Sequence, residues 1–219
     1  MTFYEGIYKV FRPIVAAVYR IHPVGTENIP RGGCILASNH TGFADVLVIS
    51  AASDRQVRYM AKKELFKIPL LAPLIRALGA YPVDRGGGDV GSIKKTIALV
   101  EEGELVGIFP QGHRHSGVDP RGTEIKHGVG MVAYHTKACV LPVFIDNKKM
   151  HTAMFRKNTV TFGKPISFEE LAFTEGGKKE YMNASRIIFD KVCEIKYGPS
   201  LAAAEEPLKL TQPAEKEDA

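Results

Sequence analysis

Residues 34–52 read CILASNHTGFADVLVISAA. The run of small and apolar side chains from Cys34 to Ser38 predicts a short buried strand. Asn39 to Gly42 predict a turn, since glycine permits backbone conformations that other residues avoid. The apolar run from Phe43 to Ala52 then predicts a helix. A strand that turns into a helix in this way is the building unit of an α/β domain.

The same alternation continues along the chain. Further strands are expected at Val57–Ala61, Ala80–Val83, Leu105–Phe109, Val140–Ile145 and, last, Asn158–Ile166. Further helices are expected at Pro69–Leu78, Val90–Glu102, Gly128–Lys137 and, closing the domain, Lys178–Tyr197. This order predicts an α/β fold with a mostly parallel sheet flanked by helices. Ligand sites in such folds lie beyond the carboxyl ends of the strands.

Three parts are expected along the chain: an N-terminal amphipathic helical segment (1–24), one domain (25–199) and a disordered acidic tail (200–219). Apolar residues recur at helical spacing through residues 3–19. Such a helix can lie in the headgroup layer of a membrane or pack on the protein's own body, and the sequence leaves both open. The tail carries few large apolar side chains, which is typical of disorder.

Composition limits the kinds of partner. The chain has 219 residues, 45% hydrophobic and 24% charged, the balance of a single globular domain. Residues 1–200 hold 27 basic and 19 acidic side chains, a formal charge of +8. A basic body suits nucleic acid, a phosphorylated small molecule or an anionic bilayer. No zinc-finger spacing or long basic block is present, so nucleic acid is not expected as a partner.

The cysteines and the apolar segments indicate where in the cell the protein is expected. Cys34, Cys139 and Cys193 are widely spaced and form no Cys-x-x-Cys pattern, so we expect neither a disulfide framework nor a zinc site. Cys34 and Cys139 lie in apolar, strand-like runs and are expected to be small buried thiols. No signal peptide is apparent, and no uncharged apolar run reaches the roughly 18 residues of a spanning helix. We therefore expect the protein at the cytoplasmic face of the membrane, as a peripheral protein.

His40 and Asp45 are the candidate catalytic pair. His40 directly follows the first strand, and the turn at Gly42 would bring Asp45 back under the imidazole. A carboxylate on one ring nitrogen fixes the tautomer and leaves the other nitrogen to take a hydroxyl proton. No Gly-x-Ser-x-Gly elbow is present, so direct attack of a substrate hydroxyl on a thioester is the simpler reaction.

Three further blocks follow in order along the chain. They are Gly79-Ala-Tyr-Pro-Val-Asp-Arg85, Phe109-Pro-Gln-Gly-His-Arg114 and Val140-Leu-Pro-Val-Phe-Ile145. Together with Asn39-His40 and Asp45, they resemble the four blocks of the PlsC-like glycerolipid acyltransferases, the family of 1-acylglycerol-3-phosphate acyltransferases. The resemblance runs from about Gly25 to Pro165, roughly two thirds of the chain.

The resemblance implies a glycerol-3-phosphate acyltransferase-like fold and a role for each block. His40 would be the general base with Asp45 its partner, and Arg85 and Arg114 would bind the acceptor's phosphate. The planar donor fork of arginine suits phosphate oxygens. The acyl donor would be acyl-CoA or acyl carrier protein, with no metal or redox cofactor. The expected reaction converts 1-acylglycerol 3-phosphate, a lysophospholipid, to phosphatidic acid.

The third block departs from the family's usual Phe-Pro-Glu-Gly-Thr-Arg. Gln111 replaces the glutamate and His113 the threonine. The amide donates as well as accepts, which leaves the acceptor open. Glycerol 3-phosphate, another lysophospholipid and a lyso-aminolipid are alternatives, as are a noncatalytic lipid-binding protein and a soluble enzyme for a phosphorylated metabolite. The expected acceptor pocket consists of Asn39, Gln111, Gly112, His113 and Lys126.

Residues 65–78 are unusually apolar for a segment that contains Pro69 and Pro73. Part of the segment must enter the core. We hypothesise that the remainder contacts the bilayer or the acyl chain, since soluble proteins seldom expose such a patch.

Overall fold

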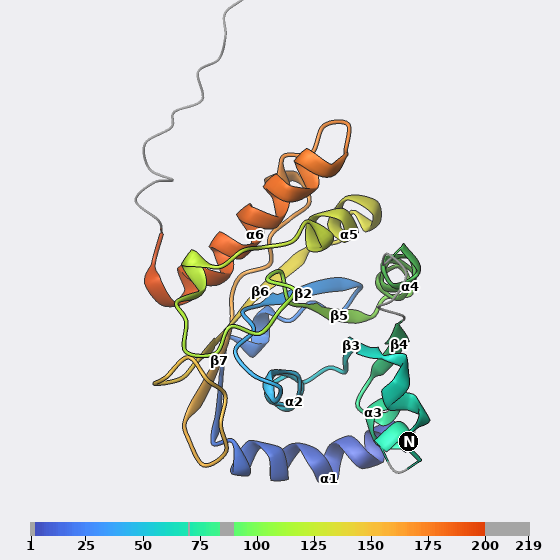
Figure 1. Cartoon of the computed structure of the whole chain (residues 1–219), viewed down its shortest axis with the longest axis vertical. Helices are drawn as coiled ribbons and strands as arrows, with labels where there is room; N and C mark the ends of the chain where they lie inside the picture. The colour runs from blue at the N-terminus through green and yellow to red at the C-terminus, as the bar shows by residue number, and fades with distance from the viewer. Residues whose placement is uncertain (1–2, 70, 84–89, 200–219) are drawn as a thin grey trace, which may run out of the picture.

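The structure, a computed structural model, describes residues 3–69, 71–83 and 90–199 (Figure 1). Arg85 and the expected acidic tail at 200–219 lie outside these ranges. Within them, no helix has both the length and the apolar character needed to cross a bilayer.

Among the described residues, seven strands form a central sheet in the order β1-β7-β6-β2-β5-β3-β4. The strands are β1 (Ile21–Val24), β2 (Cys34–Ser38), β3 (Val57–Lys62), β4 (Ala80–Val83), β5 (Leu105–Ile108), β6 (Val140–Asp146) and β7 (Asn158–Phe162). Neighbouring strands run parallel except β6 and β7, which are antiparallel. The prediction of a mostly parallel sheet is confirmed.

Helices cover both faces of the sheet (Figure 1). They are α1 (Phe3–Val18), α2 (Asp45–Ala52), α3 (Leu71–Ala77), α4 (Val90–Glu101), α5 (Gly128–Thr136) and α6 (Lys178–Tyr197). Short 3-10 helices lie at Thr26–Asn28, Lys63–Lys67, Pro120–Gly122 and Glu169–Leu171. In Figure 1, α4, α5 and α6 lie above the sheet, and α1, α2 and α3 lie below it.

Strand β2 shows why the sheet is so apolar at its centre. Its side chains alternate between two hydrophobic clusters, since Ile35 and Ala37 face the α4–α6 side while Cys34 and Leu36 face α2. All five residues of β2 are buried. A parallel strand covered by helices on both faces requires such a continuous apolar run.

The structure differs from the predicted elements mainly at the edges. Residues 21–24 form β1, which pairs with β7, so the expected N-terminal helical segment 1–24 also supplies an edge strand of the domain's own sheet. The four residues of β1 include Pro23 and are mostly exposed, a pattern too weak to mark a strand. Helix α2 begins at Asp45 rather than Phe43, because residues 39–44 are used in the turn.

The last strand and the Pro-rich helix are also shorter than expected. β7 ends at Phe162, ahead of Gly163 and Pro165, and beyond it Ile166 makes only an isolated bridge to Val140. Helix α3 covers Leu71–Ala77 of the expected Pro69–Leu78. Proline disfavours helical conformation in the residue before it. Ile68, which precedes Pro69, is extended and separates the 3-10 helix at Lys63–Lys67 from α3.

Candidate active site

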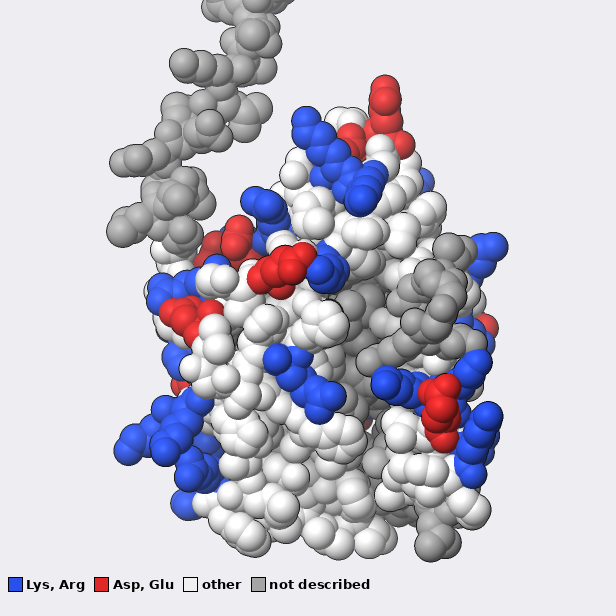
Figure 2. Space-filling model, viewed as in Figure 1, with Lys and Arg blue, Asp and Glu red and all other residues white. Residues whose placement is uncertain are grey.

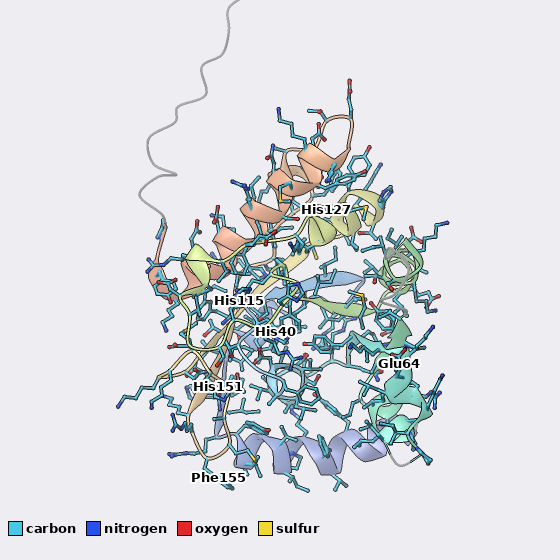
Figure 3. All side chains as sticks on the ribbon, viewed as in Figure 1. His40, Glu64, His115, His127, His151 and Phe155 are labelled. Atoms are coloured by element: carbon cyan, nitrogen blue, oxygen red, sulfur yellow. The ribbon has the colours of Figure 1, made fainter. Side chains whose placement is uncertain are left out.

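The carboxyl ends of β2, β5 and β6 lie side by side and bring three segments together. They are the turn after β2 (residues 39–44), the segment after β5 (residues 109–118) and the β6–β7 loop (residues 147–157). Figure 3 shows His40 at the centre of the molecule, with His115 and His151 from the other two segments near it in this view. Ligand-binding groups of α/β folds usually gather at the carboxyl ends of the strands, where these three segments meet.

Asp45 is fully buried and its carboxylate organises the turn after β2. Its Oδ2 accepts hydrogen bonds from His40 Nδ1 at 2.8 Å and from the backbone N–H groups of Thr41 at 2.6 Å and Gly42 at 2.8 Å. Its Oδ1 accepts from the hydroxyls of Thr41 at 3.2 Å and of Thr152 in the β6–β7 loop. As the first residue of α2, the carboxylate also lies at the positive end of that helix.

His40 is held in one tautomer. Because an ionised carboxylate only accepts, Nδ1 carries a proton, and in the neutral imidazole Nε2 then carries the lone pair. None of the residues that the structure describes hydrogen-bonds to Nε2, and the side chain is 16% exposed. The geometry predicted for the pair is therefore present, with one nitrogen fixed and the other accessible.

Aromatic rings fix the plane of the imidazole. The His40 ring stacks on Phe109 with 3.9 Å between centroids, and Phe109 stacks on Tyr59 at 5.9 Å. Tyr59 lies over Gly107 of β5, where an added Cβ would come within 2.1 Å of the tyrosine ring. Burial raises the pKa of the Tyr59 phenol well above its usual value, so this ring is neutral.

Gln111 supports the backbone of His40 instead of lining a pocket. Its side chain is only 2% exposed, its Oε1 accepts from the His40 N–H at 2.7 Å, and its Nε2 donates to the Thr123 hydroxyl at 2.8 Å. Thr123 in turn donates to the Pro120 carbonyl at 2.6 Å. The structure does not support the predicted contact of Gln111 with the acceptor, because both ends of the amide are bonded inside the protein.

Asn39 is likewise structural. It is fully buried, its Oδ1 accepts from the Ile145 N–H at 2.8 Å, and its Nδ2 donates to the Ile145 carbonyl at 3.1 Å. The paired bonds tie the end of β2 to β6. As with Gln111, the structure does not support the predicted place of Asn39 in the acceptor pocket, because both polar atoms of its amide are bonded to Ile145.

The other predicted pocket residues form an exposed rim. Gly112 has φ +70°, and a Cβ there would approach Lys126 Cγ to 3.1 Å, so glycine is favoured at this position. His113 is exposed, and Lys126 pairs with Glu124 at 2.5 Å on the surface. The rim lies beside the base, because the His115 N–H, in the same segment, donates to the His40 carbonyl at 2.8 Å.

Arg114 is an exposed cation of this rim. Its guanidinium lies over the Phe43 ring, 5.7 Å from the centroid, and no carboxylate of the described residues forms an ion pair with it. Its donors remain available to an anion. Arg85, its predicted partner, lies outside the described residues.

Two contributors to the site were missed by sequence reasoning. Thr152 bonds Asp45 across 107 residues of sequence, and Thr123 lies twelve residues from Gln111, so no spacing signals either contact. Phe109 was placed at a strand end without its role as a stacking partner. Among the described residues, no three His, Cys, Asp or Glu side chains gather as a metal site would require.

Known proteins resemble the chain in sequence. A family model described as Acyltransferase matches residues 20–146, more than half of the chain. The 1-acyl-sn-glycerol-3-phosphate acyltransferase of Bacillus subtilis (strain 168) is 34% identical over 150 residues, covering 67% of this chain and 73% of that protein. The protein of the same name from Streptococcus pneumoniae is 28% identical over 156 residues, covering 68% of this chain and 57% of its own length.

A solved structure shares the fold. The crystal structure of PlsC, the 1-acyl-sn-glycerophosphate (LPA) acyltransferase from Thermotoga maritima, superposes with a TM-score of 0.64 at 21% identity. The similarity covers 88% of this chain and 81% of that one. Since the family match spans more than half of the residues and the α/β architecture agrees, the chain belongs to the PlsC-like acyltransferase family.

Proposed function

We propose that this acyltransferase moves an acyl group from acyl-CoA or acyl carrier protein to the sn-2 hydroxyl of 1-acylglycerol 3-phosphate, giving phosphatidic acid. The pair of His40 and Asp45 carries the proposal, because its 2.8 Å bond leaves a basic nitrogen at the open edge of the sheet. The names of the relatives from Bacillus subtilis and Streptococcus pneumoniae support the acceptor.

The proposed chemistry is a single acyl transfer without a covalent enzyme intermediate. Nε2 of His40 takes the proton of the acceptor hydroxyl while its oxygen attacks the thioester carbonyl. The carbon–sulfur bond then breaks, and the departing thiolate takes the proton from the imidazolium. Asp45 stabilises the imidazolium between these steps, as the carboxylate does in catalytic triads. The acyl donor is a substrate, and the proposed step needs no metal or redox cofactor.

Recognition of the acceptor is assigned to the rim. Arg114 offers unpaired donors to the phosphate, and we propose that Arg85 completes the clamp. His113 adds a donor beside them when protonated. Because His113 stands where the family has threonine, the second candidate acceptor is a lysophospholipid with a different headgroup.

We further propose a peripheral position on the cytoplasmic face of the membrane. The exposed positions of α1 between residues 10 and 18 are all apolar: Val10, Pro13, Ile14 and Ala17. The one charged residue of that stretch, Arg12, turns inward and donates to the Ala51 carbonyl at 2.9 Å. The helix packs on the body and still presents an apolar stripe outward, so the two roles left open by the sequence are compatible.

The decisive experiment is an assay of the purified chain with two radiolabelled acyl donors, acyl-CoA and acylated acyl carrier protein, tested separately. The acceptor panel contains 1-acylglycerol 3-phosphate, glycerol 3-phosphate, lysophosphatidylglycerol and a lyso-aminolipid. We expect phosphatidic acid as the main product. A preference for another acceptor would replace the proposed substrate, and absence of transfer to any acceptor would replace the enzyme by a lipid-binding protein.

A further inference from the structure

The β6–β7 loop, residues 147–157, is strongly basic. It contains Lys148, Lys149, Arg156 and Lys157, and no aspartate or glutamate. All four cationic side chains are exposed. Figure 2 shows Lys and Arg gathered at the lower left of the molecule, the side on which this loop lies in Figure 1. The loop therefore presents positive charge with no anion of its own to neutralise it.

The tip of this loop is apolar and exposed to solvent. Met154 is 57% exposed and Phe155 is 73% exposed. Figure 3 shows Phe155 at the bottom of the molecule, level with α1. The backbone fixes it there, because the Phe155 N–H donates to the Val18 carbonyl at the end of α1 at 2.7 Å. An aromatic side chain held outward in this way exposes apolar area that water disfavours.

The tip continues the apolar stripe of α1. We propose that the β6–β7 loop docks this protein on an anionic lipid bilayer, with Met154 and Phe155 entering the acyl boundary and the flanking cations contacting lipid headgroups. The proposal rests on the proposed function only in that the acceptor is a membrane lipid. Apolar residues bordered by Lys and Arg are the pattern that anionic interfaces attract.

A second copy of the chain is a poorer occupant of this surface. A twofold interface places the same patch of both subunits face to face, which would bring the four cations of one loop against those of the other. Like charges brought together at an interface oppose association. Phosphate headgroups supply the missing opposite charge.

Docking at this loop would place the catalytic pair at the membrane. Thr152 lies only three residues before Phe155 and donates its hydroxyl to Asp45 Oδ1. The Thr41 and Thr152 hydroxyls are 3.0 Å apart. The same short segment therefore carries the bilayer contact at one end and a hydrogen bond to the carboxylate of the base at the other.

Vesicle co-sedimentation of the full chain tests the proposal. Vesicles of phosphatidylcholine alone are compared with equimolar phosphatidylcholine and phosphatidylglycerol. The apolar variant is M154Q/F155N; asparagine suits position 155, where φ is +58°. The charge variant is R156Q/K157Q. The matched control is V24T, an exposed apolar residue three positions beyond Ile21 at the far end of β1.

We expect the apolar variant to bind anionic vesicles at least about tenfold more weakly than wild type. The charge variant should lose roughly 25-fold on anionic vesicles, about fivefold for each cation, and little on neutral ones. V24T should bind as wild type does. Circular dichroism and the thermal midpoint establish that each variant is folded, so loss of binding cannot be loss of structure.

Wild-type binding by M154Q/F155N would overturn the proposal. So would a change in its sedimentation coefficient without a change in vesicle binding, since that result would assign the surface to a second copy. Acyl transfer is not measured in this experiment. A wild-type protein that binds vesicles without transferring acyl groups would contradict the proposed function alone, and an active enzyme that ignores vesicles would contradict the docking alone.

Discussion

Strand β2 has a pair of ionisable side chains at each end. At the amino end, Cys34 lies beside Cys139 with the two Sγ atoms 3.4 Å apart. At the carboxyl end, Asp45 holds His40 through a 2.8 Å bond. Both pairs interact directly, and each brings together residues that the fold places on neighbouring segments. Only the second pair is a candidate for catalysis.

The difference lies in what surrounds each pair. At the amino end, the Arg55 guanidinium donates hydrogen bonds to the backbone carbonyls of Gly32 at 2.8 Å, Gly103 at 2.9 Å and Pro30. At the carboxyl end, Arg114 has no such partner among the described residues. An ionisable pair becomes a reaction site where one of its atoms and a neighbouring cation remain free for a substrate.

Removal of the His40 imidazole should have the largest effect on turnover. His40→Ala is expected to lower kcat roughly 10²–10⁴-fold, because proton removal from the acceptor hydroxyl then falls to water. Steady-state kinetics with 1-acylglycerol 3-phosphate measures the effect. An almost fully active His40→Ala enzyme would remove the general-base mechanism.

Removal of the Arg114 guanidinium should weaken binding of the phosphorylated acceptor. Arg114→Ala is expected to raise KM for the phosphorylated acceptor roughly 10–100-fold, the loss of a charge-assisted hydrogen bond, with a smaller change in kcat. Arg31→Ala is the matched control, since Arg31 is an exposed arginine paired with Asp54 away from the site. Equal effects of the two substitutions on KM would contradict phosphate binding by Arg114.

Thr152 is expected to act through Asp45. Thr152→Val removes one hydrogen bond to the carboxylate while keeping the shape, and should lower kcat about tenfold, equivalent to about 1.4 kcal/mol, with KM unchanged. Thr152→Ser restores the hydroxyl and should recover most of the rate. If serine fails to rescue, the effect belongs to packing and not to the hydrogen bond.

Gln111→Glu, which restores the family's usual residue, should have a small effect. The carboxylate can still accept from the His40 N–H but can no longer donate to Thr123. We expect a loss of about 1 kcal/mol in the free energy of unfolding. Relative rates with different acceptors should stay the same, because Gln111 does not line the pocket. A changed acceptor profile would show that the side chain reaches substrate.

The amino-end pair should matter least for turnover. The hydrogen bond with Cys34 lowers the pKa of the half-buried Cys139 to about 7, whereas the same hydrogen bond, followed by burial, raises the pKa of Cys34. Cys139 should therefore react faster with iodoacetamide as the pH rises through 7, because the thiolate is the nucleophile. Activity of Cys139→Ala should stay within about twofold of wild type, by the general tolerance of sites remote from the chemistry. A large loss would mean that both ends of β2 contribute to turnover.

The fold could be predicted from the sequence where the local hydrophobic pattern is strong. β2 has five consecutive buried residues, and its bounds were predicted as observed. β1 depends on pairing with β7, at the other end of the domain, and its own residues carry no strand pattern. The sequence also placed the acidic partner of His40 correctly, because a turn containing Gly42 leaves few other positions for Asp45.

The polar contacts between distant segments could not be predicted in the same way. Asn39 and Gln111 belong to blocks that suggest substrate contact, yet both are buried and bonded to backbone. Whether an amide at a strand end faces substrate or supports the turn depends on which segment packs behind it. That information comes from Thr123 for Gln111 and from Ile145 for Asn39, 12 and 106 residues further along the chain.

The long-range bonds of the site also set the order in which activity can arise during folding. Asp45 is hydrogen-bonded to Thr152, and His40 to Gln111, through contacts that span 107 and 71 residues. Contacts of such long range form late, because closing the long loop between the two residues costs entropy before the contact can stabilise it. On the ribosome, the base would emerge well before the residues that hold it. Enzyme activity should therefore be among the last signals to return on refolding, after most helical structure has formed.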